Sequence, residues 1–197
     1  MTPDAEPKVR RSRLSEERER ELYEAVIELL REVGYDALTM DAIAARTRSS
    51  KATLYRQWNG KPELVAAALR SCRPITAADV DTGTLRGDLR ELLRLRCATS
   101  LRDAALMRAL GQAMHKDPDL LRAFRTLVVE PETAALAAML GRGVDRGELA
   151  PDCPAAPFVP HMVLGALAAR PLLEGVEADP EYLARYVDAV VLPALGL

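Results

Sequence analysis

The segment from Leu38 to Leu64 constrains the fold more than any other part of the sequence. It has the pattern of two short helices joined by a tight turn, and it holds no acidic residue between Asp41 and Glu63. A compact helix pair with charges of one sign fits DNA, whose backbone carries a negative charge about every 1.7 Å of helix axis. The segment therefore predicts a helix-turn-helix DNA-binding unit. Its five cations are Arg46, Arg48, Lys51, Arg56 and Lys61.

Charge is distributed unevenly along the chain, which has 197 residues and a net charge of −2. Up to Arg73 there are 14 basic and 12 acidic residues, whereas 13 basic and 17 acidic residues follow. A basic N-terminal part and a mildly acidic remainder are expected of a DNA-binding unit attached to a sensor body. Arginine outnumbers lysine 23 to 4, and a GC-rich genome is an alternative source of that bias.

Other functional classes have little support in the sequence. No run of 18 uncharged apolar residues is present, so we expect no membrane span and no membrane partner. The N-terminus lacks the apolar stretch of a signal peptide. Cys72, Cys97 and Cys153 are odd in number and widely spaced, which predicts neither a disulfide framework nor a metal site and suits a reducing cytoplasm.

Enzymatic signatures are also missing from the sequence. It shows no Ser-His-Asp arrangement, no glycine-rich phosphate loop and no metal-ligand cluster. We therefore expect no catalytic residues, no cofactor and no metal. A small helical hydrolase is the alternative from another class, and a structural nucleoid protein is a third.

Helical patterns extend over nearly the whole chain, and they predict three parts. Residues 1–13 are rich in charge and proline and predict a disordered basic arm. Residues 14–73 predict the DNA-binding domain, in which a fourth, linking helix starts after Asn59-Gly60 and runs to about Cys72. The expected caps and stops of its first three helices are Ser15 and Gly34, Thr39, and Ser50 or Ser49.

Residues 74–197 predict a larger helical domain that follows a connector from Arg73 to Thr84. We expect one helix from about Leu85 through Cys97 and a separate one over Asp103–Met114. Another starts at Asp117-Pro118, is kinked or restarted at Pro131, and ends at Gly147. Two final helices are expected over roughly Ala155–Leu173 and Asp179–Leu195. The fold class is therefore all-α, with a three-helix helix-turn-helix domain and a larger C-terminal helical domain.

A resemblance to a known family rests on residue types and spacings in the first third of the chain. These residues are Gly34-Tyr35, Thr39, Ile43-Ala44, Ser50-Lys51, Thr53-Leu54-Tyr55, Trp58 and Lys61-Glu63-Leu64. Through them the chain resembles TetR-family transcriptional regulators. D-R-G-E-L and D-P-E-Y-L in the remainder are similar but less distinctive. One departure is the turn before Ser50, where the family usually has a glycine and a small aliphatic residue. Arg48-Ser49 stands there instead, which is expected to loosen the turn and to direct an extra cation toward DNA.

The resemblance implies DNA contacts from the turn, the recognition helix and the start of the linking helix. Lys51 and Thr53 lie where a recognition helix meets base edges, with phosphate or solvent contact as the alternative. Tyr55 and Lys61 resemble the family's phosphate-binding residues, with a packing role and a solvated position as alternatives. Trp58 is expected to anchor the core. The predicted DNA-binding residues are Thr39, Arg48, Ser49, Ser50, Lys51, Thr53, Tyr55, Arg56 and Lys61.

The basic arm is a further candidate DNA contact. Arg10, Arg11 and Arg13 can enter a minor groove, and a solvated tail is the alternative.

The C-terminal domain is expected to bind an effector and to dimerise. Methionine and phenylalanine side chains are candidates for an apolar pocket, although each can be ordinary core: Met107, Met114, Phe124, Met139, Phe158 and Met162. The last two helices are apolar over more than one face, and the resemblance implies that they form a four-helix dimer interface. Its candidate residues are Val163, Leu164, Leu167, Leu183, Tyr186, Val187, Val190 and Val191.

Together these features predict a cytoplasmic, homodimeric repressor. It would bind a palindromic operator in double-stranded DNA and would be released by a small, largely apolar effector. An activator and a ligand-independent DNA-binding protein are the alternatives.

Overall fold

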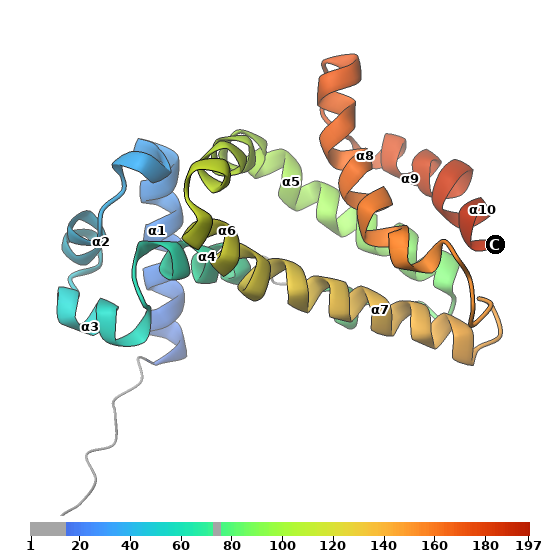
Figure 1. The fold of residues 1–197 in the computed structure, drawn as a ribbon, viewed down its shortest axis with the longest axis horizontal. Helices are drawn as coiled ribbons and strands as arrows, with labels where there is room; N and C mark the ends of the chain where they lie inside the picture. Colours follow the sequence, from blue (N-terminus) through green and yellow to red (C-terminus); the bar gives the residue numbers. More distant parts are fainter. Residues whose placement is uncertain (1–14, 73–75) are drawn as a thin grey trace, which may run out of the picture.

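The computed structural model describes residues 15–72 and 76–197, with backbone alone over 96–104. Within these residues the elements are helices and helical turns, and no strand occurs. The helices form a small N-terminal head and a longer C-terminal body (Figure 1). The expected basic arm over residues 1–13, and the part of the expected connector at 73–75, lie outside the described residues.

The head contains the four helices that the sequence predicts. Their caps are confirmed, because the side-chain oxygens of Ser15, Thr39 and Ser50 accept from backbone N–H groups three residues later at 3.3, 3.1 and 3.0 Å. Gly34, at φ 75°, ends the regular part of the first helix, and one further turn follows it. The helices are α1 (Glu16–Ala37), α2 (Met40–Thr47), α3 (Lys51–Gln57) and α4 (Lys61–Ser71).

Residues 76–197, the described part of the body, form six α-helices and four short turns of other helical types. In Figure 1 α5 and α7 run lengthwise, and α8, α9 and α10 lie at the end away from the head. The α-helices are α5 (Leu85–Lys116), α6 (Pro118–Phe124), α7 (Glu130–Asp145), α8 (Val159–Glu174), α9 (Pro180–Tyr186) and α10 (Leu192–Leu195). The 3₁₀ turns are Ala77–Asp79 and Ala156–Phe158, and the π-helical turns are Arg125–Val129 and Val187–Val191.

The prediction of two separate helices between Leu85 and Met114 is wrong. The structure has one continuous helix of 32 residues, α5. The sequence between Cys97 and Asp103 is A-T-S-L-R, which holds neither glycine nor proline. Weak helix formers such as threonine and serine do not stop a helix that neighbouring turns extend from both sides.

The two π-helical turns each precede a proline. Pro131 lies in the first turn of α7, directly after the turn Arg125–Val129, and Pro193 lies in the first turn of α10, after Val187–Val191. Proline has no N–H and its ring clashes with the carbonyl four residues earlier in a regular helix. A wider turn before it relieves that conflict, so the expected restart at Pro131 is confirmed.

The head and body share one hydrophobic core. Leu30 and Leu64 of the head belong to the same buried cluster as Leu110, Leu120 and Val128 of the body. A second cluster fills the far part of the body, between α5, α7 and α8 to α10. Because the first cluster crosses the boundary between head and body, a change in the packing of α6 or of the turn after it reaches α4 directly.

A buried carboxylate ties the start of α5 to the end of α7. The side chain of Asp88 is fully buried, and it accepts from the Thr82 N–H at 2.6 Å and from Arg146 Nη2 at 3.2 Å. Glu148 accepts from the backbone N–H of Leu85 at 2.6 Å. The D-R-G-E-L segment therefore closes the far end of the body.

Candidate nucleic-acid interface

The turn between α2 and α3 has an unusual backbone. Arg48 adopts a left-handed conformation, with φ 50° and ψ 37°, and its N–H lies against the last carbonyls of α2. It is the one residue other than glycine with positive φ among the described residues. Such a conformation costs about 1–2 kcal/mol for a residue with a Cβ. Glycine at position 48 would avoid this cost, so the arginine side chain is present at a backbone position that favours glycine.

The recognition helix α3 has one buried and one exposed side. Leu54 is completely buried and Trp58, just after the helix, is nearly so, which agrees with the expected anchoring role of Trp58. Tyr55 lies on the outer side with 56% of its surface exposed. Its hydroxyl is thus carried on a rigid ring that projects away from the core, as a phosphate contact requires.

The cations of the head fall into two groups. Arg48 and Arg56 are exposed, and among the described residues neither forms an ion pair. Arg46 is instead held by Glu32, with Nη2 at 2.7 Å from Oε2, and this contact lowers the pKa of Glu32. Arg46 is therefore neutralised within the head, whereas the guanidinium groups of Arg48 and Arg56 are available to phosphates.

Lys51 forms an ion pair with Asp41 across the two helices. Both side chains are exposed, so the pair is weak and can exchange with a DNA partner. This partner is missed by the sequence-based reasoning, which treated the cations as a surface of one sign. The available signal was Asp41 itself, because a residue in the first turn of α2 lies near the start of α3 in such a helix pair.

Lys61 occupies the junction between α1 and α4. Its Nζ donates to the carbonyl oxygen of Tyr35 at 2.9 Å and lies 4.1 Å from the centre of the Tyr35 ring. The side chain is half-buried, so it is not the freely solvated residue that was one alternative. Its contact with phosphate stays a prediction, and it would require Nζ to serve Tyr35 and DNA together or to change partner.

The hydroxyl groups near the turn are used locally. The oxygen atoms of Thr39 and Ser50 accept from helix N–H groups, Ser50 Oγ lies 2.8 Å from Thr53 Oγ1, and Ser49 Oγ donates to the Thr47 carbonyl at 3.4 Å. An accepting cap leaves the hydroxyl proton of Thr39 free to donate to a phosphate. The capping role and the phosphate role are compatible.

The expected dimer residues divide between the protomer core and its surface. Leu183, Val187 and Val191 are buried inside the protomer, so they do not lie on a free surface as we expected. Their apolar character is explained by packing against the rest of the body. Val163, Leu167 and Tyr186 are half-buried, whereas Leu164 and Val190 are exposed. At the end of α8 and just after it, Leu172, Leu173 and Val176 are exposed apolar residues that the expected set did not include.

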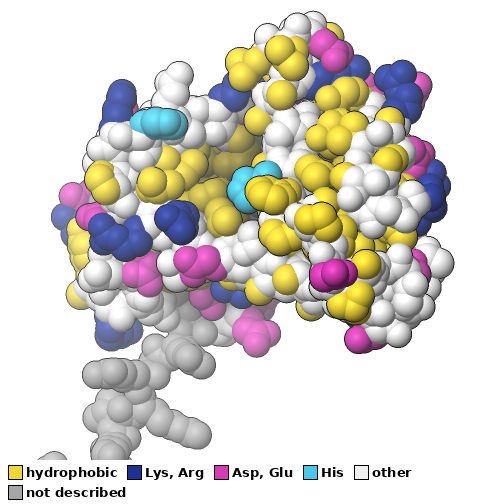
Figure 2. Space-filling model, turned by 45° about the vertical axis from the view of Figure 1, so that its right-hand side comes forward, with side chains coloured by type: hydrophobic (Ala, Val, Ile, Leu, Met, Phe, Trp, Pro, Cys, Tyr) yellow, Lys and Arg dark blue, Asp and Glu magenta, His cyan; other side chains and the backbone are white. Residues whose placement is uncertain are grey.

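The exposed members form an apolar face on the C-terminal helices. Leu164 of α8 is 60% exposed, and Leu172 near the end of α8 is 87% exposed. Figure 2 shows apolar side chains gathered over this part of the molecule. By length and composition alone, the segment Ala156–Glu174 could also cross a membrane. Only 11% of its apolar 18-residue stretch is buried inside the protomer.

The six residues expected to line an effector pocket do not surround one cavity. Met107, Met114 and Phe124 pack against the core shared with the head, whereas Met139 is fully buried in the second core, where Met162 also packs. Phe158 is exposed beside His161, with ring centres 6.0 Å apart. A cavity of about 570 Å³ lies elsewhere, between head and body. Within the described residues, no three histidine, cysteine or acidic side chains gather as a metal site would require.

Comparisons with known proteins cover both halves of the chain. The sequence model described as "Bacterial regulatory proteins, tetR family" matches residues 22–68, and "Tetracyclin repressor-like, C-terminal domain" matches residues 79–190. An uncharacterized HTH-type transcriptional regulator of Mycobacterium tuberculosis H37Rv, Rv1556, is 35% identical over 90% of this chain and 88% of its own length.

Two further proteins are similar to the chain over most of its length. The DNA-binding transcriptional repressor TetR of Mycobacteroides abscessus is 34% identical over 90% of this chain and 93% of its own. The crystal structure of the TetR family transcription regulator SCO0332 superimposes with a TM-score of 0.73 and 29% identity, covering 92% of this chain and 99% of that one. The exposed recognition helix, the two sequence models and these relatives lead to one conclusion: the chain belongs to the TetR family of transcriptional regulators.

Proposed function

We propose that the chain is a homodimeric transcriptional repressor, which binds a palindromic operator and leaves it when a small molecule binds. The observation that carries the proposal is the exposure of Arg48 in the turn and of Tyr55 and Arg56 on α3. Free guanidinium groups and a projecting hydroxyl suit phosphates on both sides of a groove. Lys51 and Thr53, near the start of α3, would meet base edges.

Dimerisation is proposed from the apolar face on α8 and the segments after it. Apolar residues as exposed as Leu172 and Leu173 gather on a monomer surface mainly where a partner covers them. A second copy supplies the same face, and a two-fold interface of this kind is the commonest way to cover it. Two recognition helices related by that axis would then meet two half-sites of a palindrome.

A membrane is the other environment that could cover α8. The ionic contacts of α8 argue against a membrane. Arg170 of α8 lies 2.7 Å from Asp179 Oδ2 and 4.2 Å above the ring of Tyr182. These contacts hold α8 against α9 and would have to be broken, or buried in lipid at considerable cost, if α8 crossed a bilayer. We therefore propose a protein partner and a cytoplasmic location, where the DNA is.

Repression is proposed over activation because of the relative in Mycobacteroides abscessus, whose name describes a repressor. Release by a small molecule is proposed because the 570 Å³ cavity adjoins both the head and the body. A ligand that favours one arrangement of head and body shifts the DNA-binding equilibrium by its difference in affinity for the two states.

The operator proposal is tested by selecting a site from random DNA and varying the spacing of its half-sites. We expect a sharp affinity optimum at one spacing, about one helical turn or a multiple of it between half-site centres. Equal affinity for one isolated half-site would contradict binding by a symmetric dimer.

The dimer proposal is tested separately by sedimentation of the purified protein without detergent. The double change Leu164→Glu and Val190→Glu places charges on the apolar face, and we expect it to convert dimers to monomers. Val33→Glu, at an exposed apolar residue of the head, is the matched control and should leave dimers intact. Dimers that persist in the double variant would place the interface elsewhere.

A further inference from the structure

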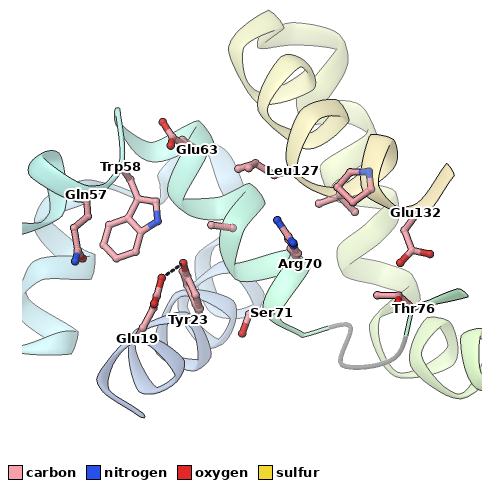
Figure 3. A pocket seen from close by; sticks show the side chains of 13 residues that line it. Glu19, Tyr23, Gln57, Trp58, Glu63, Arg70, Ser71, Thr76, Leu127 and Glu132 are labelled. Atoms are coloured by element: carbon pink, nitrogen blue, oxygen red, sulfur yellow. Dashed lines mark hydrogen bonds between the residues drawn. The ribbon is translucent and has the colours of Figure 1, made fainter. Parts of the chain in front are cut away.

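Helix α1 contacts the chain on both sides of the recognition helix α3. After α3, the ring of Trp58 meets the ring of Tyr23 edge-on, with 5.8 Å between ring centres. Figure 3 shows these two side chains and the hydrogen bond of 2.6 Å from the Tyr23 hydroxyl to Glu19 Oε1. Before α3, Nη2 of Arg18 donates to the carbonyl oxygen of Thr47, the last residue of α2. Arg18 and Thr47 are 29 positions apart in the sequence, so this contact joins α1 to the end of α2.

The Thr47 carbonyl is one of the acceptors that a helix leaves unpaired at its C-terminal end. In the turn that follows, the N–H of Ser49 donates back to the carbonyl of Ala44 at 3.0 Å. That bond satisfies a carbonyl further back in α2 and leaves the oxygen of Thr47 to another donor. Arg18 is this donor, and its positive charge also suits the negative end of the helix dipole.

The Thr47 carbonyl belongs to the peptide unit that leads directly into Arg48. A peptide unit is planar, so a donor that fixes its oxygen also fixes the orientation of the whole unit. Arg48 has a φ of 50°, a conformation that a residue with a Cβ keeps only where its surroundings determine it. Two residues later Ser50 caps α3. Arg18 therefore acts on the backbone from which the direction of α3 is set.

The guanidinium group of Arg18 is itself held by a second contact. Its other terminal nitrogen, Nη1, donates to Glu21 Oε2 at 2.8 Å, about one turn further along α1. A guanidinium group carries its donors in a fixed planar arrangement and can serve both acceptors together. Since the Arg18 side chain is 39% exposed, these contacts rather than burial determine where it lies.

We propose that Arg18 positions the recognition helix for reading bases, by holding the turn between α2 and α3 at the Thr47 carbonyl. This deepens the proposed function, in which Lys51 and Thr53 would meet base edges. Hydrogen bonds to base edges depend strongly on distance and angle, whereas phosphates attract cations over longer distances. A small displacement of the start of α3 therefore reduces the preference for the operator more than it reduces the affinity for DNA in general.

The proposal is tested by changing Arg18 and measuring affinity for two duplexes, the sequence selected from random DNA and a shuffled duplex of the same length. Arg18→Met removes the guanidinium group but keeps an unbranched side chain that suits a helix. One base contact contributes about five- to 150-fold to discrimination. We expect the ratio of the two dissociation constants to fall by about fivefold or more in Arg18→Met. Arg18→Lys keeps a charged donor for the Thr47 carbonyl and should retain most of the native preference.

A matched control removes the same charge from the same part of α1. Arg20 is exposed and lies two residues after Arg18. Because charges that act only through phosphates carry no sequence information, Arg20→Met should change the ratio of dissociation constants by less than about twofold.

Hydrogen exchange provides a second readout, which needs no DNA. The N–H groups of Arg48 and Ser49 close the turn by donating to carbonyls of α2. In Arg18→Met we expect these two amides to exchange faster by about threefold or more, because the turn opens more often. The amide of Leu69, which is buried in α4, should keep its native exchange rate.

Three results would overturn the inference. An equal loss of affinity for both duplexes in Arg18→Met, with a slope of log K against log salt lower by about 0.9, would make Arg18 a direct phosphate contact. Faster exchange at Leu69 as well as at Ser49, with an unchanged ratio, would limit Arg18 to a role in stability. Unchanged exchange at Arg48 and Ser49 would show that Arg18 does not hold the turn. A native protein without any sequence preference would instead overturn the proposed function, and the exchange rates would still decide whether Arg18 holds the turn.

Discussion

Tyr35 of the head donates a hydrogen bond to Asp117 of the body, with 2.7 Å between Tyr35 Oη and Asp117 Oδ2. Asp117 also caps α6, accepting from the N–H groups of Asp119 and Leu120. Lys61 holds the carbonyl of Tyr35 from the start of α4. The end of α1, the start of α4 and the junction of α5 with α6 are thus connected through one tyrosine.

Replacing Tyr35 by phenylalanine should destabilise the protein by about 1–2 kcal/mol, because a hydrogen bond to a charged group is lost while the ring packing stays. The free energy of unfolding in urea measures this. A loss of less than about 0.5 kcal/mol would mean that the contact contributes little. Tyr23→Phe, which removes a hydrogen bond to Glu19 inside the head, is the matched control for effects on the head–body contact.

The same contact predicts a pH dependence. The Tyr35 hydroxyl, together with the N–H groups of Leu120 and Asp119 and the charge of Lys61, lowers the pKa of Asp117. A carboxyl group whose pKa is lower in the folded than in the unfolded state stabilises the folded state at pH values above its unfolded pKa of about 3.9. That stabilisation is lost as the pH falls below about 3.9 and through the pKa of the folded state. Unfolding free energies of the native protein and Tyr35→Phe should therefore converge below about pH 4. A constant difference down to pH 2 would contradict the role of Asp117.

The ion pair between Lys51 and Asp41 predicts that Asp41 restrains DNA binding. Asp41→Asn releases the lysine and removes a negative charge that would face phosphates. We expect tighter binding to all DNA sequences and a salt dependence of log K that is steeper by up to about one unit. Lys51→Ala should instead alter base preference at one position by roughly 1–3 kcal/mol. A uniform loss of affinity in Lys51→Ala, with no change in preferred sequence, would assign Lys51 to phosphate.

The head could be predicted closely from the sequence because its signals are local. Ser15, Thr39 and Ser50 cap their helices through contacts within three residues, and Gly34 stops α1 through its own backbone. Leu54 and Trp58 lie one turn apart, so their burial follows from helical spacing.

The body could be predicted less well because its features depend on contacts between distant residues. Periodicity marks Leu183 and Leu164 equally as apolar, yet one packs inside the protomer and the other is exposed. The choice depends on which side of each helix packs against the rest of the protomer, and no local pattern contains that information. The cavity between head and body cannot be predicted from local patterns either, because its lining residues come from segments far apart in the sequence.

The buried carboxylate Asp88 should be one of the most sensitive positions for stability. Burial alone would raise its pKa, but hydrogen bonds from Thr82 and Arg146 outweigh that effect and lower the pKa. Asp88→Asn leaves Arg146 without its buried partner and should cost about 3 kcal/mol. Asp81→Asn, at an exposed carboxylate beside the same arginine, should cost less than about 1 kcal/mol. Similar losses for both changes in urea unfolding would show that burial of Asp88 is not what matters.

At Arg48 we expect stability and DNA binding to make opposite demands on the side chain. Arg48→Gly relieves a left-handed backbone at the cost of added chain entropy, so we expect stability to rise by about 0.5–1 kcal/mol. It also removes an exposed cation next to the recognition helix, so operator affinity should fall and the slope of log K against log salt should decrease by about 0.9.

Two matched variants separate backbone from charge at this position. Arg48→Asn keeps a side chain that tolerates the left-handed conformation but has no charge, and it should weaken DNA binding as Arg48→Gly does. Arg48→Lys keeps both the charge and the strain, and it should retain the salt slope of the native protein. Because a phosphate contact carries no sequence information, all three variants should keep the same preferred operator. Equal salt slopes for Arg48→Gly and Arg48→Lys would show that Arg48 does not contact DNA.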